Sequence, residues 1–211
     1  MSATQPLHIG TDDRQLFAAL DGDPSTARAL LVLCPPLLHE HFLGYRMLAL
    51  LCKRLADAGW ATLRFDYYGS GDSAGDDSDF SLAGAARDTR AAVAWLRERS
   101  AAPLLLGGVR GGAWPALANA DQADRLLLWQ PLASGADWLS HLLTADLAER
   151  SDLMRFPLLP KLPKPAEDDW LLGSSCPAKL RNELLFADWP AQPGIPVDLA
   201  THAESILLER W

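Results

Sequence analysis

Residues 104–114 read Leu-Leu-Leu-Gly-Gly-Val-Arg-Gly-Gly-Ala-Trp, and this stretch decides the fold. A short apolar run stops at a cluster of glycines, and an alanine-rich segment that favours a helix follows it. This order predicts a β-strand that turns sharply into an α-helix. Such a turn needs glycine, because strand and helix come so close that a Cβ atom would clash. Gly108 and Gly112 flank the centre of the turn, and Arg110 stands at its tip.

Strand-like and helix-like segments alternate on both sides of this turn. Apolar runs and alternating patterns predict strands at residues 14–20, 29–34, 60–65, 103–107, 124–130 and 195–200. Helical spacing and capping residues predict helices at residues 45–58, 81–99, from the turn to about 120, and at 138–149, 178–186 and 204–211. The repeated order of strand and helix predicts an α/β fold with a doubly wound, mostly parallel sheet and helices on both of its faces.

The chain is expected to form one domain over residues 1–211, a length that buries a sizeable core. Its second half is less regular than its first. Residues 156–165 hold four prolines, which excludes a regular helix or strand there. We therefore predict an irregular, cap-like insertion at about residues 137–190.

Composition excludes several classes of partner. The net charge is −8, whereas nucleic acids and anionic membranes both require a basic face. The three cysteines lack paired spacing and are expected to be buried thiols in a reducing compartment. Residues 1–15 contain no apolar signal-peptide core, and no apolar run reaches the roughly 20 residues that a membrane span needs. These features predict a cytoplasmic protein.

Three segments resemble one known superfamily. They are Leu33-Cys34-Pro35-Pro36, residues 64–75 (Arg-Phe-Asp-Tyr-Tyr-Gly-Ser-Gly-Asp-Ser-Ala-Gly) and residues 126–131 (Leu-Leu-Leu-Trp-Gln-Pro). Together with the turn at Arg110 they look like the α/β-hydrolases. Within that superfamily they resemble the serine aminopeptidase-like hydrolases, especially the subgroup that includes the exosortase A system-associated hydrolases. The resemblance covers about residues 14–211, and it implies the α/β-hydrolase fold.

The resemblance also implies a catalytic triad in the order serine, acid, histidine, which this chain does not show cleanly. The turn corresponds to the nucleophile elbow Gly-x-Ser-x-Gly, but Arg110 stands where the serine is expected. Asp198 lies inside the strand that the acid normally follows, and Glu204 lies beyond it. The histidine is expected after one further strand, so His202 comes too early, and the sheet is expected to be shortened at its C-terminal end.

A second segment, Gly71-Asp72-Ser73-Ala74-Gly75, matches the elbow motif letter for letter. It lies well inside a predicted loop, however, and acidic residues follow it instead of a helix. A nucleophile elbow needs strand, turn and helix in immediate succession. Ser73 is therefore a weak candidate nucleophile that is expected to shape its loop.

The predicted loop after residue 36 carries further candidate residues. By resemblance it supplies one backbone N–H group of the oxyanion hole. His39 and His41 stand two residues apart there, but the sequence has no second cluster to complete a metal site, so we expect no metal and no cofactor. The candidate binding residues are Leu37, His39 and Glu40 of this loop and Val109, Arg110 and Gly111 of the turn.

Arg110 admits two interpretations. A cation beside the backbone N–H groups at a helix start could bind a carboxylate, phosphate or sulfate. Alternatively, Glu40, Asp66 or Asp72 could neutralise it, in which case it holds loops together. We predict in particular a carboxylate–guanidinium pair of Glu40 with Arg110, because both should reach the carboxyl edge of the sheet.

The leading functional expectation is therefore an α/β-hydrolase-like protein without ordinary serine-hydrolase activity. One alternative is an active hydrolase that cleaves an acyl ester or thioester with non-standard residues. Another is a pseudo-enzyme that binds a small anionic or acyl ligand or a protein. A third is that the open edge of a shortened sheet pairs with a second copy or a partner chain.

Overall fold

A computed structural model of the chain describes residues 3–132, 134–153, 155, 169–187 and 197–200. Within these ranges, no helix is both long enough and apolar enough to cross a membrane. The three cysteines are buried and free, as predicted. The predicted helix at 204–211 and the proline-rich residues 156–165 lie outside the described ranges.

The centre of the fold is a seven-stranded sheet with the spatial order β1-β2-β4-β3-β5-β6-β9. Its strands are β1 (Gln5–Thr11), β2 (Arg14–Asp21), β3 (Ala29–Cys34), β4 (Trp60–Phe65), β5 (Leu104–Val109), β6 (Arg125–Trp129) and β9 (Val197–Ala200). Pairing is antiparallel between β1, β2 and β4 and parallel across the rest of the sheet. The predicted mostly parallel sheet is thus confirmed. Strand β1 was not predicted, because this edge strand is mostly exposed and lacks an apolar run.

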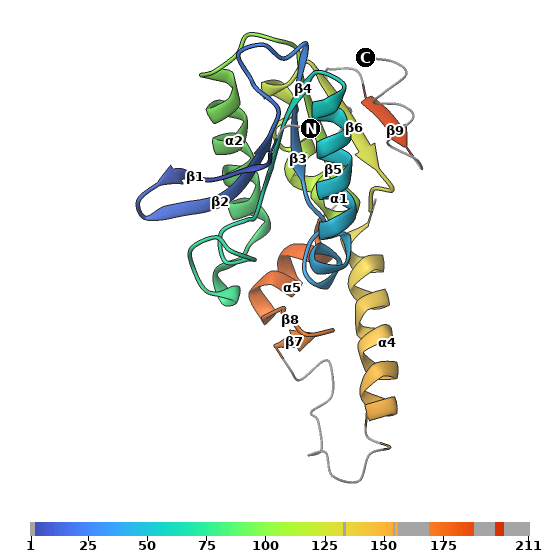
Figure 1. Cartoon of the computed structure of the whole chain (residues 1–211). Coiled ribbons are helices and arrows are strands. Elements are labelled where there is room, and N and C mark those ends of the chain that lie inside the picture. Colours follow the sequence, from blue (N-terminus) through green and yellow to red (C-terminus); the bar gives the residue numbers. More distant parts are fainter. Residues whose placement is uncertain (1–2, 133, 154, 156–168, 188–196, 201–211) are drawn as a thin grey trace.

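Helices cover both faces of the sheet, so the predicted double winding is confirmed (Figure 1). Leu31 and Leu33 of β3 pack with α1 (His39–Asp57) on one face. Leu30 and Val32 pack on the other face, in the cluster that includes α2 (Leu82–Arg97) and α3 (Ala113–Leu117). The apolar run of β3 is continuous because this strand is buried on both sides.

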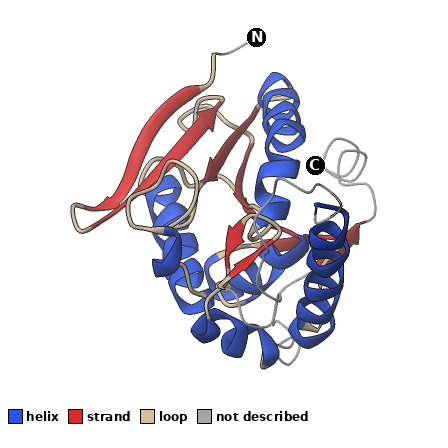
Figure 2. Cartoon of the chain, turned by 90° about the horizontal axis from the view of Figure 1, so that it is seen from below, coloured by secondary structure: helices blue, strands red, loops and turns tan. Residues whose placement is uncertain are grey.

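Two further helices and a small hairpin extend the molecule beyond the sheet (Figures 1 and 2). These are α4 (Gly135–Leu153), β7 (Trp170–Leu171), β8 (Ser174–Ser175) and α5 (Ala178–Leu185). Asp146 and Arg150 of α4 form a buried ion pair of 2.5 Å. Asp146 accepts from the backbone N–H of Leu172, and Arg150 donates to the carbonyl of Trp170, so this pair fixes the hairpin to α4.

Predicted helix boundaries were wrong at three helices. Helix α4 spans Gly135–Leu153 instead of residues 138–149. Helix α1 begins at His39 and not near residue 45, so the segment His39-Glu40-His41 is its first turn and not a loop. Gly44 weakens the helical pattern in the sequence, yet in the structure it packs against Pro36. After the turn at Arg110, α3 ends at Leu117 instead of near residue 120, and the short 3₁₀ helix Ala120–Gln122 follows it.

Candidate functional site

The turn between β5 and α3 has the predicted tight geometry. Arg110 has a positive φ of 52°, which side-chain-bearing residues adopt only at a cost of roughly 1–2 kcal/mol. A Cβ atom at Gly108 would lie 2.7 Å from the Cα atom of Ala113. A Cβ atom at Gly112 would overlap the carbonyl oxygens of Cys34 and Pro35 at the end of β3. The glycines thus allow the close approach that raises Arg110 at the carboxyl edge of the sheet.

Arg110 forms a bidentate ion pair with Glu40, which confirms the predicted contact. The Nε atom donates to Oε2 at 3.2 Å, and Nη2 donates to Oε1 at 3.0 Å. The side chain of Glu40 is 16% exposed and that of Arg110 is 34% exposed. A fork of two parallel bonds fixes the orientation of both groups. The guanidinium of Arg110 therefore lies at the tip of the turn, and the carboxylate of Glu40 neutralises its charge.

Neighbouring groups extend this pair into a brace between four segments. The indole Nε1 of Trp138 in α4 donates to Oε1 of Glu40 at 3.3 Å. The Nη1 atom of Arg110 lies 3.5 Å from the carbonyl oxygen of Gln130, just beyond β6. The pair thus connects the first turn of α1, the β5–α3 turn, the end of β6 and the start of α4.

The two histidines of α1 lie in different surroundings, as expected for residues two positions apart on a helix. His41 is buried, and its Nε2 atom lies 3.2 Å from Oδ1 of Asp66. The Nδ1 atom of His39 is buried without a hydrogen-bond partner among the described residues. Burial lowers the pKa of His39, His141 and Arg110 lower it further, and Glu40 opposes the shift.

The described residues contain no group of three histidine, cysteine or acidic side chains that could hold a metal ion.

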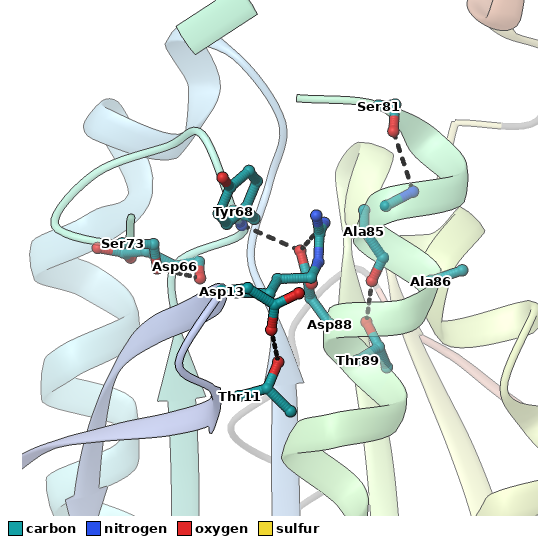
Figure 3. A network of polar contacts seen from close by, with 12 residues as sticks. Thr11, Asp13, Asp66, Tyr68, Ser73, Ser81, Ala85, Ala86, Asp88 and Thr89 are labelled. Carbon is teal, nitrogen blue, oxygen red and sulfur yellow. Dashed lines mark hydrogen bonds and ion pairs between the residues drawn. The ribbon is translucent and has the colours of Figure 1, made fainter. Parts of the chain in front are cut away.

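Ser73 is an anchor for its loop. Its hydroxyl donates to the carbonyl oxygen of Asp66 at 2.6 Å and accepts from the backbone N–H of Phe17 at 2.9 Å. Figure 3 shows Ser73 and Asp66 beside the contact of Tyr68 with Asp88. The proton of this hydroxyl is already donated within the loop, so the geometry fits the shaping role expected for Ser73.

The other predicted site residues lie near the turn, except Asp198, which lies in β9. Gly111 and Leu37 are adjacent, since a Cβ atom at Gly111 would lie 2.9 Å from Cγ of Leu37. Val109 is buried at the end of β5, directly before Arg110. Asp198 lies in β9, where its backbone is in register with Leu127 of β6.

His202 and Glu204 lie outside the described residues. That this chain lacks a clear triad acid and histidine therefore stays a prediction.

An open pocket of about 420 Å³ lies beside Arg110 and was not predicted. The residues that line it with Arg110 are Pro131, Leu132, Ser134, Asp137, Trp138 and His141. Nothing in the sequence singles out His141, which the first turns of α4 bring to this pocket. The one available signal was position: the segment from Pro131 onward follows β6 at the same carboxyl edge as Arg110.

Comparison with known proteins identifies the fold. No protein-family model matches the chain, and no curated protein matches it. Solved structures do match. One is an α/β serine hydrolase without a lid from Xanthomonas campestris, with 26% identity, a TM-score of 0.53, and a match that covers 63% of this chain and 63% of that one. The match thus spans less than two thirds of that hydrolase.

Two further structures are matched over more of their length. Est1E from Butyrivibrio proteoclasticus, solved with bound ferulic acid, is 20% identical with a TM-score of 0.62, and the match covers 92% of this chain and 77% of Est1E. The thioesterase domain from the curacin biosynthetic pathway is 18% identical with a TM-score of 0.54, and the match covers 93% of this chain and 82% of that domain. The chain therefore has the α/β-hydrolase fold.

Proposed function

Because the chain has the α/β-hydrolase fold, we propose that it is a hydrolase-like protein without ordinary serine-hydrolase activity. The bidentate pair of Arg110 with Glu40 carries this proposal. A guanidinium stays protonated and has no lone pair, so it cannot attack a carbonyl carbon. Both carboxylate oxygens of Glu40 accept hydrogen bonds from Arg110, so this carboxylate is not a free reacting group either.

The same pair argues for a structural role of Arg110 over an anion-binding role. An anion that bound Arg110 would have to displace a carboxylate that is held by two bonds from the guanidinium and one from Trp138. Glu40 is 16% exposed and Arg110 is 34% exposed, so water screens the pair less than it screens an ion pair on the open surface. The residue at the nucleophile position thus connects four segments of the chain and does not react.

A second candidate function is the binding of a small acyl ligand without turnover. The open pocket beside Arg110 favours it, because the partly exposed Pro131 and Leu132 offer apolar surface next to the tip of the turn. Est1E was solved with ferulic acid, which makes aromatic carboxylic esters sensible test compounds for this chain.

The proposal is tested with the purified chain, a fluorophosphonate probe, p-nitrophenyl acetate, ethyl ferulate and a short acyl thioester. We expect no labelled serine and hydrolysis at the rate of the blank, both for the natural chain and for Arg110→Ala. A known esterase serves as the positive control. Turnover above the blank that is lost in Ser73→Ala, or in any other serine variant, would overturn the proposal.

A further inference from the structure

A second pocket, of about 60 Å³, lies between three segments that are far apart in the sequence. Leu38 and Phe42 line it from the start of α1, Phe80 lines it from the loop after β4, and Ser174 lines it from the β7–β8 hairpin. This pocket shares no lining residue with the one beside Arg110. The two are separate sites.

The walls of this second pocket are mainly apolar. Leu37, Leu38 and Phe80 form part of them, and Phe42 stands at the rim with 64% of its surface exposed. The hydroxyl of Tyr67 donates to the carbonyl oxygen of Pro35, so this side chain offers no free hydroxyl to a ligand. One water needs roughly 10–15 Å³ by this measure, so the pocket admits several waters or one small ring.

The hairpin side of the pocket holds a polar group without a partner. Ser174 is 7% exposed, and its Oγ atom has no hydrogen-bond partner among the described residues. A buried hydroxyl without a partner is unfavourable, and most such groups in folded proteins are satisfied. The Oγ atom is itself buried in the present rotamer, so a ligand in the pocket reaches this hydroxyl when the side chain turns to another staggered rotamer.

The charge around the pocket is negative. Asp77 lines the pocket and is exposed, and no lysine or arginine is among the described residues that line it. The same loop carries four more aspartates: Asp66, Asp72, Asp76 and Asp79. A concave site with one sign of charge concentrates ligands of the opposite sign. A carboxylate ligand is therefore disfavoured here.

We propose that this pocket binds a small organic amine with an apolar or aromatic body. The ammonium donates a hydrogen bond to the Ser174 hydroxyl in the field of Asp77, and the body packs on Leu38, Phe42 and Phe80. This site does not depend on whether the turn at Arg110 supports hydrolysis.

Three ligands of one shape test the proposal: benzylamine, benzyl alcohol and benzoate, each titrated into the ¹⁵N-labelled full chain. Backbone resonances of Gly69, Gly173 and Ser174 are expected to shift, and the indole resonance of Trp138 is expected to stay in place. Affinity should fall from the amine to the alcohol to the carboxylate. Benzoate binding as tight as that of benzylamine, or shifts confined to the surroundings of Arg110, would show the proposal to be wrong, as would the absence of any shift.

Two conservative variants separate the two contributions to binding. Ser174→Ala should weaken both the amine and the alcohol, by about three- to tenfold. Asp77→Asn should weaken the amine alone, by about two- to fivefold. Asp57→Asn, at the exposed far end of α1, is the matched control and should change neither affinity. Equal affinities for the amine in Ser174→Ala, Asp77→Asn and the natural chain would overturn the assignment.

Discussion

Two segments of this chain share one spacing of glycines and differ in secondary structure and in backbone conformation. The turn Gly108-Val109-Arg110-Gly111-Gly112 joins a strand to a helix, and its central residue has a positive φ. The loop Gly71-Asp72-Ser73-Ala74-Gly75 has positive φ at both of its end glycines, whereas Ser73 does not. The first segment has the backbone of a nucleophile elbow and lacks a serine. The second has a serine at its centre and lacks the backbone conformation of an elbow.

The difference shows that one spacing of glycines is compatible with two different backbones, and that only one of them is a strand–turn–helix. In the turn, the strain at Arg110 persists because β5, α3 and the end of β3 determine the backbone on three sides. In the loop, the hydroxyl of Ser73 is used to hold the backbone of Asp66 and Phe17. A motif search without the structural context would select the loop, which lacks the strand–turn–helix geometry of a nucleophile elbow.

The largest expected effect sharpens this contrast in stability. Gly112→Ala should lower the free energy of unfolding by more than about 3 kcal/mol, because the new Cβ atom overlaps two backbone carbonyl oxygens that cannot move aside cheaply. Gly75→Ala should cost about 1–2 kcal/mol, because its new Cβ atom meets the Tyr68 ring, a side chain that can shift, at a φ that alanine disfavours. Urea unfolding of both variants measures the difference.

Cys34 supplies a second readout for this prediction. Burial raises the pKa of its thiol to about 12, so alkylation of the folded natural chain should be slow. Gly112→Ala disturbs the end of β3, where Cys34 lies, and should accelerate alkylation of this thiol. Similar losses of stability in Gly112→Ala and Gly75→Ala would contradict the contrast between turn and loop.

The second prediction concerns the brace at the tip of the turn. Glu40→Ala removes the acceptor of two bonds from Arg110 and one from Trp138, and should cost about 2 kcal/mol in chemical denaturation. Glu40→Gln keeps one acceptor oxygen and should cost less. If both variants unfold like the natural chain, the pair is not a brace.

Ser73→Ala should have a smaller effect, of about 1 kcal/mol, because it removes one bond to the carbonyl of Asp66 and one from the N–H of Phe17. It should leave fluorophosphonate labelling and ester hydrolysis unchanged, since the serine is a loop anchor. Loss of a measurable activity in this variant would reverse the comparison, because the loop would then be the reactive segment.

The smallest expected effect is a dependence of stability on pH. Burial lowers the pKa of His39, so between that lowered pKa and the ordinary value of about 6.5 the unfolded chain binds more protons than the folded chain. The free energy of unfolding should therefore fall as the pH decreases below about 6.5. Above about pH 6.5, His39 is neutral in both states and should cause no loss of stability. His39→Gln should flatten this slope in urea titrations at several pH values, with His8→Gln on exposed β1 as the matched substitution. An unchanged slope in His39→Gln would contradict the burial of this side chain.

Much of the fold followed from local patterns. The continuous apolar run of residues 29–34 and the segment 60–65 predicted β3 and β4 with the bounds that the structure has. Elements with a weak local pattern were missed or misplaced. Gly44 hid the first turns of α1, and strands β7 and β8 of two residues each carry no periodicity.

The candidate site was predictable in part. The pair of Glu40 with Arg110 could be expected, because two parallel strands deliver the segments that follow them to one edge of the sheet. His141, Asp137 and Ser174 could not be found in this way. They lie in α4 and in the β7–β8 hairpin, which are held together by contacts such as those of Asp146 and Arg150 with the hairpin.

The sequence by itself determined that a strand turns into a helix at residues 108–112 and that an arginine, which cannot be a nucleophile, stands at the tip. These properties are local, since glycine spacing and side-chain chemistry do not depend on distant residues. Only the tertiary structure decided that Glu40, and not Asp66 or Asp72, pairs with Arg110, and that Ser174 is buried without a hydrogen-bond partner among the described residues. Each of these depends on segments that are remote in sequence, and packing and hydrogen bonding select their neighbours only when the whole chain is folded.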